Sequence, residues 1–153
     1  MSTPTERLAE LGLALPPVAA PAGAYVPARR TGNLVFTAGQ LPFVDGKLAA
    51  TGKVGAEIDP DTGYELARAC ALNALAAVDA LVGLDAVVGV IKVVGFVASA
   101  PGFGGQPKVL NGASDLLGEV FGEAGRHARS AVGVAELPLD TPVEVELVVE
   151  VAG

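Results

Sequence analysis

Two charged residues near the C-terminal end of the chain could do chemistry on a small organic acid. Arg129 follows a glycine-rich helix end and stands at the expected mouth of a strand. A guanidinium there can offer a planar fork of N–H donors to a carboxylate. Glu144 stands near the start of the next expected strand, on one alternation face with Glu146 and Glu150. Such a face ordinarily points to solvent; the alternative is that the glutamate nearest the strand start orients a water in a pocket.

The other candidate groups are isolated in the sequence. His127 could act as a general base, but no serine or cysteine stands at a fixed spacing from it, which favours a surface or supporting role. The chain has one histidine and one cysteine and no pair at metal-ligand spacing, so we expect no metal site. The run Gly102–Gly105 lacks the spacing of a phosphate-binding loop and is interpreted as a flexible connection.

Composition limits the class of protein. The chain has 153 residues, which is enough for one domain with a real core. Hydrophobic residues make up 51% of it and charged residues 18%, which leaves more apolar surface than one small domain should expose and indicates an oligomer. The net charge is −7 and the pI about 4.6. The basic clusters, Arg29–Arg30 and Arg126–Arg129, are small, so we expect no nucleic-acid partner.

The mean hydropathy of +0.51 raises the question of a membrane span. The most apolar stretch, Val87–Ala100, is interrupted by Lys92 and two glycines. It is also shorter than a membrane-spanning helix, which needs about 20 apolar residues. The first residues show no basic segment followed by an apolar core, so no secretory signal is expected. Cys70 stands in an alanine-rich run and is expected to be buried. These features favour a cytoplasmic protein with no membrane partner.

Helix caps and hydrophobic periodicity predict the elements that must position these residues. Helices are expected at Pro4 to about Gly12, Pro60–Leu81 and Pro107–Gly122, the first two behind caps at Thr3 and Asp59. Strands are expected at Tyr25–Arg29, Leu34–Gly39, Val87–Ser99, Ser130–Glu136 and Val143–Val151.

The order of these elements predicts the fold class. Thr31-Gly32-Asn33 predicts a hairpin between the first two strands, and Asp45-Gly46 marks a turn in a loop that runs to Glu57. Strands paired antiparallel, with two helices on one face, give an α+β sandwich. Residues 1–24 form an N-terminal helix and a Pro/Ala-rich linker, and residues 25–153 form the main α+β domain.

Four segments in consistent order carry a family resemblance: Gly23–Val26, Gly32–Pro42, Arg129–Pro138 and Val143–Glu146. Together they resemble the RidA (YjgF) family of reactive-intermediate deaminases. The resemblance implies a chorismate-mutase-like fold with a mixed β-sheet and two main helices on one face, assembled as a homotrimer. It also implies that enamines and imines released by pyridoxal-phosphate enzymes, such as 2-aminoacrylate, are hydrolysed to a 2-keto acid and ammonia, with no cofactor.

The resemblance also implies roles for particular residues in a cleft between subunits. Arg129 matches the arginine that binds the carboxylate of the small imino-acid ligand. Glu144 matches the glutamate that orients the water or moves the proton. Other positions that line this cleft or contact the substrate are matched by Tyr25, Ala38, Gly39, Asn111 and Ser130.

The chain departs from the family pattern at several places. Ala38 stands where many members carry a serine, and Ala131 replaces a cysteine common after Arg-Ser. Residues 1–24 extend beyond the usual family start. Two other functions stay open on the sequence: a non-catalytic trimer that binds small carboxylates as a sensor or scaffold, and an endoribonuclease, which the acidic composition disfavours.

Overall fold

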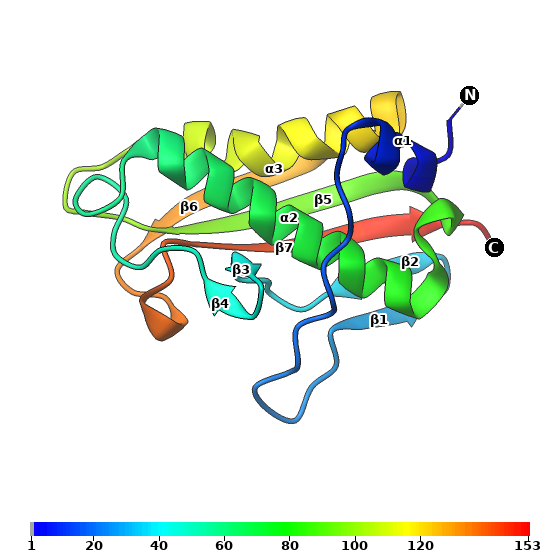
Figure 1. Cartoon of the computed structure of the whole chain (residues 1–153), viewed down its shortest axis with the longest axis horizontal. Coiled ribbons are helices and arrows are strands. Elements are labelled where there is room, and N and C mark those ends of the chain that lie inside the picture. The colour runs from blue at the N-terminus through cyan, green and yellow to red at the C-terminus, as the bar shows by residue number, and fades with distance from the viewer. Residues whose placement is uncertain (1) are drawn as a thin grey trace.

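The computed structural model describes residues 2–153 and contains helices and strands in alternation (Figure 1). The helices are α1 (Pro4–Glu10), α2 (Pro60–Val82) and α3 (Gln106–Phe121), with short 3-10 turns η1 (Leu84–Ala86), η2 (Gly122–Gly125) and η3 (Pro138–Asp140). The strands are β1 (Ala28–Thr31), β2 (Leu34–Thr37), β3 (Phe43–Val44), β4 (Lys47–Leu48), β5 (Val87–Ala98), β6 (Ala128–Val134) and β7 (Val143–Val151).

The main sheet has the strand order β1-β2-β7-β5-β6, and α2 and α3 lie together on one of its faces (Figure 1). The α+β class, the mixed sheet and the two covering helices are therefore confirmed. The expectation that all strands pair antiparallel is wrong, because β5 and β6 run parallel. The cause is α3, which crosses over between them as the helix of a β-α-β unit.

The predicted helix starts are confirmed by their caps. Asp59 Oδ1 accepts from the backbone N–H of Thr62 at 2.7 Å, and Thr3 Oγ1 accepts from that of Glu6 at 3.1 Å. Each bond satisfies a donor that the first turn of a helix leaves without a partner. At the other end of α2, Gly83 has a φ of +83°, which a glycine adopts without strain.

Two of the strands begin at residues other than the predicted ones. The first strand begins at Ala28 and not at Tyr25, because Pro27 has no N–H to donate to the ladder. The sixth strand begins at Ala128 and not at Ser130, so Arg129 lies inside the strand, beside Val93 of β5. The hairpin of β1 and β2 is confirmed, with Gly32 and Asn33 as its loop. The Asp45-Gly46 turn is also present, and the pair β3–β4 that it joins is too short to show periodicity.

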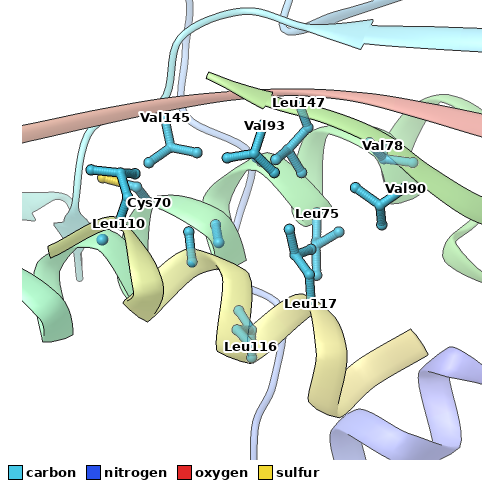
Figure 2. Packing of buried hydrophobic residues seen from close by; sticks show 14 of the residues in the cluster. Cys70, Leu75, Val78, Val90, Val93, Leu110, Leu116, Leu117, Val145 and Leu147 are labelled. Atoms are coloured by element: carbon cyan, nitrogen blue, oxygen red, sulfur yellow. The ribbon is translucent and has the colours of Figure 1, made fainter. Parts of the chain in front are cut away.

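The core lies between the sheet and the two long helices (Figure 2). Every second side chain of β7 is buried against the helices, as the alternation of that strand predicts. Cys70 on α2 is fully buried, as expected, and burial raises the pKa of its thiol well above the ordinary value. Figure 2 shows Leu75 and Leu117 of the helices below Val93 and Leu147 of the sheet, and Leu110 beside Cys70 and Val145.

The opposite face of the sheet is open in the described chain and carries exposed apolar side chains beside the glutamates of β7. Phe36 on β2 is 45% exposed, Ile91 on β5 43% and Val132 on β6 43%. Large side chains grouped in this way on one sheet face ordinarily mark a contact surface. A face of this kind is consistent with the oligomer that the composition indicates.

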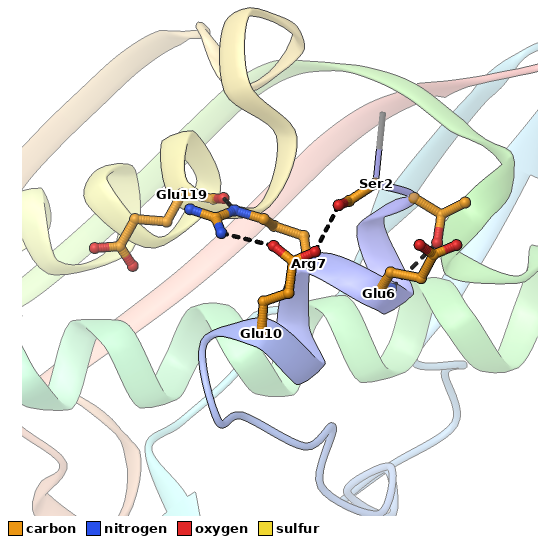
Figure 3. A network of polar contacts seen from close by, with 6 residues as sticks. Ser2, Glu6, Arg7, Glu10 and Glu119 are labelled. Carbon is orange, nitrogen blue, oxygen red and sulfur yellow. Dashed lines mark hydrogen bonds and ion pairs between the residues drawn. The ribbon is translucent and has the colours of Figure 1, made fainter.

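Helix α1 is fastened to the far end of the helical layer. Leu8 enters the core, with 4% of its surface exposed. The Arg7 Nε donates to the backbone oxygen of Glu119 on α3 at 2.8 Å, and Arg7 Nη1 pairs with Glu10 at 2.9 Å (Figure 3). From α1 the chain runs across α2 as an irregular strap, residues 12–27, before it enters β1 (Figure 1).

Within residues 2–153, no helix combines the length and hydropathy that a membrane span requires.

The closest approach of α2 and α3 depends on Gly112. A Cβ added there would overlap the backbone carbonyl of Tyr64, whereas one added at Gly118, on the same helix, would meet no atom within 4 Å. We expect Gly112→Ala to lower the free energy of unfolding by about 2 kcal/mol through overpacking. Gly118→Ala should leave it unchanged or raise it by about 0.5–1 kcal/mol, the gain in helix propensity. Urea titrations followed by circular dichroism measure both; equal stability of the two variants would contradict this packing.

Candidate functional site

Arg129 is held on the helical side of the sheet by α3. Its Nη1 donates to Asn111 Oδ1 at 2.8 Å and to Ser114 Oγ at 3.1 Å. Asn111 and Ser114 are three residues apart on α3, so they share one face of that helix. The proximity of Arg129 and Asn111 agrees with their predicted roles in one site.

The guanidinium of Arg129 has no acidic partner among residues 2–153. Both N–H bonds of Nη1 are directed to neutral oxygens. The three N–H bonds on Nε and Nη2 have no partner in the described chain. Nε and Nη2 together form the edge that binds a carboxylate through two parallel hydrogen bonds. The Nε/Nη2 edge of Arg129 therefore has the hydrogen-bond donors needed to bind a small carboxylate.

His127 is also part of this cluster, through a contact with Ser114 that is not predicted from the sequence. Its Nε2 lies 2.9 Å from Ser114 Oγ, and its Nδ1 lies 2.6 Å from the backbone oxygen of Gly125. The sequence did not reveal this pair because 13 residues separate Ser114 from His127, and only the packing of α3 against β6 brings them together. Two spacings in the sequence could have indicated this cluster. Asn111 and Ser114 are three residues apart and share a helix face, and His127 and Arg129 are two residues apart and share a side of an extended segment.

Glu144 lies in a different place, in a pocket of about 330 Å³ that it shares with Tyr25 and Gly39. A Cβ on residue 39 would overlap the Glu144 carboxylate, so only a glycine lets this carboxylate pack against the backbone. The segment is held there by Gln40 and Val145, whose backbones exchange hydrogen bonds of 2.8 and 3.0 Å. Three of the predicted site residues therefore meet in one pocket.

The environment of Glu144 favours its protonated form. Burial raises the pKa of the Glu144 carboxyl, and the neighbouring Glu146 carboxylate raises it further. The glutamates of β7 differ in this respect: Glu144 is half-buried, and Glu150 at the other end of the strand is exposed. The interpretation of this face as wholly solvent-facing is thus wrong at Glu144, because the segment 39–41 covers it.

Arg129 and Glu144 point to opposite faces of the sheet. Arg129 is level with Val93, whose side chain is buried beneath the helices, and Glu144 is level with Phe96, on the other face. Strand β5 lies between them. They are separated by roughly 10 Å across the strands and roughly another 10 Å along them, on ordinary sheet spacings. One chain therefore does not place these two residues in one pocket.

The remaining predicted residues divide between these two regions. Ser130 is level with Val94 and Glu146, so its side chain points to the open face, away from that of Arg129. Ala38 precedes Gly39 but is not one of the residues that line the Glu144 pocket. Its backbone N–H donates to the Pro27 oxygen at 2.8 Å. Gly102–Gly105 connects β5 to α3, as the sequence indicates.

The strap contributes a wall that sequence reasoning missed. Ala19–Ala22 line the Glu144 pocket opposite Leu41, Pro138 and Leu139. Nothing in a Pro- and Ala-rich run identifies the surface that it covers, so this part of the pocket had no sequence signal. Among the described residues, the lining is mostly apolar, with Glu144 as its one charged side chain. Across residues 2–153, no three or more His, Cys, Asp or Glu side chains gather in an arrangement that could hold a metal ion.

Comparison with known proteins places these features in a family. Residues 5–151 match the family model described as "YjgF/chorismate mutase-like, putative endoribonuclease". The chain belongs to this YjgF family. The match begins at residue 5, so the family model includes α1 and the strap.

Individual relatives of this YjgF-family chain support the same assignment. Protein TCP17 of Trypanosoma cruzi is 47% identical over 145 residues, covering 94% of this chain and 91% of the relative. A structure named as a "putative endoribonuclease" from Shewanella oneidensis is 38% identical, with a TM-score of 0.94 over 98% of this chain and all of the other. E. coli TdcF, solved with bound serine, is 26% identical, with a TM-score of 0.65 over 90% of this chain and 94% of that one.

Substituting Glu144→Gln should stabilise the YjgF-family chain at neutral pH. Because the folded pKa of Glu144 is raised above its ordinary value of 4.5, the native state retains a proton that the unfolded chain has released. The stability that this proton contributes is present at low pH and is lost as the pH rises through the folded pKa. The advantage of the glutamine variant should therefore shrink as the pH falls from about 8 to about 5.

Chemical denaturation at one fixed protein concentration measures this difference. Glu150→Gln, at the exposed end of the same strand, is the matched control and should show no such trend. An advantage of Glu144→Gln that stays constant across the pH range would contradict the assigned environment.

Proposed function

We propose that this protein hydrolyses the imines and enamines of small 2-amino acids, giving a 2-keto acid and ammonia, in a site shared between subunits of a homotrimer. The observation that carries the proposal is the Nε/Nη2 edge of Arg129, which has no acidic partner among residues 2–153. A 2-imino acid has a carboxylate next to its C=N carbon. Anchoring that carboxylate fixes the position of the carbon that water attacks.

Glu144 supports the second half of the reaction. Water adds to the C=N carbon and one of its protons passes to the nitrogen, which gives a carbinolamine. The hydroxyl proton of this intermediate then passes to the nitrogen as the C=O bond forms and the C–N bond breaks, so that ammonia leaves. An enamine first takes a proton on carbon to become the imine. A carboxylate whose pKa is raised by burial is a stronger base than an ordinary glutamate, and it can accept and return these protons. The apolar walls of its pocket suit the carbon chain of the substrate.

The opposite facing of Arg129 and Glu144 supports a site between subunits. In a head-to-tail ring, one surface of each chain meets a different surface of the next, so the Arg129 region of one subunit can complete the Glu144 pocket of its neighbour. A closed ring of three uses each surface once. The apolar side chains exposed on the open face of the sheet supply surface that such an assembly can bury.

The relatives give further support. TdcF is solved with bound serine, an amino acid whose carboxylate sits next to the carbon that bears the nitrogen, as in the proposed substrate. We place the reaction in the cytoplasm, where pyridoxal-phosphate enzymes release such intermediates. The proposal differs from the endoribonuclease name that several relatives carry.

Arg129→Ala should lower kcat/KM by about 100-fold, the loss of a bidentate charged contact. The assay measures ammonia release while an amino-acid oxidase generates the imine in the same solution. Arg126→Ala is the matched control, because Arg126 is exposed and pairs only with Glu123 in the described chain. If the wild-type protein gives no acceleration, or if both variants retain it, the deaminase proposal is wrong.

Mixed trimers test whether the site is shared. Arg129→Ala and Glu144→Gln subunits, each inactive alone, should regain about a quarter of wild-type activity when co-expressed, since random assortment leaves that share of interfaces with both residues intact. Two differently tagged chains allow the mixed trimers to be purified; each of these has one intact interface of three, so about a third of wild-type activity is expected from them. No recovery would show that both residues act within one chain or that the assembly differs.

The endoribonuclease name of the relatives is the second candidate, and its test is simple. A ribonuclease must bind RNA with an affinity that falls as salt rises. A net charge of −7 opposes this binding. Cleavage of RNA by the wild-type protein that Arg129→Ala abolishes would replace the deaminase proposal.

A further inference from the structure

The pair Ser114–His127 has no part in the proposed reaction, yet it is joined directly to Arg129. The hydrogen bonds form one chain: the Gly125 oxygen, the imidazole of His127, the hydroxyl of Ser114, Nη1 of Arg129 and the amide oxygen of Asn111. Its four contacts measure 2.6, 2.9, 3.1 and 2.8 Å in that order. Both His127 and Ser114 are partly buried, which limits competition from water.

The direction of each bond in this chain follows from the two ends. A carbonyl oxygen only accepts, so Nδ1 of His127 carries the proton that it shares with Gly125. In the neutral imidazole Nε2 then has a lone pair and accepts from the Ser114 hydroxyl. The single proton of Ser114 is thereby committed to His127. Its oxygen presents only lone pairs to Arg129, which always donates.

A serine in a helix ordinarily turns its hydroxyl toward the carbonyl four residues back. The structure shows no such bond for Ser114; the side chain is turned toward His127 instead. The histidine therefore selects the orientation in which Ser114 can accept from Nη1. With Asn111 as the second acceptor, both protons of Nη1 are fixed, and the plane of the guanidinium is fixed with them.

We propose that His127 and Ser114 are positioning residues, which hold Arg129 so that its Nε/Nη2 edge faces the substrate carboxylate. The inference rests on the proposed role of Arg129 as the anchor. Neither residue exchanges a proton with the substrate. The pair acts on binding, and the chemical step that follows depends on Glu144.

The first experiment measures binding and turnover. Ser114→Ala should raise the KM for the imine substrate and the Kd for 2-oxobutanoate each about fivefold, which is the effect of losing one ordinary hydrogen bond. The kcat should stay within about twofold of wild type. Ser114→Thr, which keeps a hydroxyl, should restore most of the affinity. His127→Phe should behave as Ser114→Ala does. His127→Gln, which can place an oxygen near Nε2, should lie closer to wild type.

The second experiment needs no ligand. His127 is the single histidine of the chain, so its 15N-labelled ring gives an unambiguous NMR spectrum. We expect a protonated Nδ1 and a lone-pair Nε2, with the Nε2 signal shifting in Ser114→Ala. The 15N signals of Arg129, identified by their absence in Arg129→Lys, should show faster rotation about the Cζ–Nη1 bond in Ser114→Ala and in His127→Phe.

The outcomes separate this inference from the proposed function. Wild-type protein that neither binds 2-oxobutanoate nor releases ammonia would refute the anchor role, while the guanidinium rotation would still decide whether the pair orients Arg129. Wild-type binding that needs Arg129 but is unchanged in Ser114→Ala and His127→Phe would overturn the positioning role alone. A wild-type histidine with its neutral proton on Nε2 would also overturn it. Thermal unfolding of each variant serves to confirm that it folds.

Discussion

The parallel pairing of β5 with β6 is the constraint on which the site depends. It sets Arg129 level with Val93 and turns its side chain toward α3, where Asn111 and Ser114 receive it. The antiparallel pairing of β5 with β7 sets Glu144 level with Phe96 on the other face. A shift of either strand by one residue would exchange these faces, because the side-chain period of a strand is two. Register thus keeps the two groups on opposite faces of the sheet within one chain.

The helical layer fixes the other half of the cluster. The small residues along α2, and Gly112 on α3, let the two helices approach closely. The buried leucines of α3 then hold that helix against β5 (Figure 2). In consequence Asn111 and Ser114 are held at fixed positions beside β6. The imidazole of His127, which directly precedes β6, contacts the Ser114 hydroxyl there. A neutral set of oxygens around a guanidinium leaves its charge for a ligand, whereas a carboxylate in the same place would have neutralised it.

The sequence was informative wherever a local rule governs structure. The caps at Thr3 and Asp59, the Gly32-Asn33 turn and the alternation of β7 each act within a few residues, and the structure agrees with them. The parallel pairing of β6, the Ser114–His127 contact and the opposite facing of Arg129 and Glu144 depend on register and packing between distant segments. No spacing in the chain encodes these directly. The resemblance to the YjgF family supplied the site residues, but it did not show that they divide between two regions of one chain.

The strap has a consequence for how relatives of this protein can diverge. Residues 19–22 wall the Glu144 pocket but belong to no helix or strand, and they carry no side chain that the sheet needs for its own packing. Irregular surface segments accept substitutions and changes of length at little cost in stability. The width and polarity of this pocket can therefore vary through the strap without any change in the register that faces Arg129 and Glu144 in opposite directions. The lining of this pocket and the facing of the two charged residues are in this way encoded in separate parts of the chain.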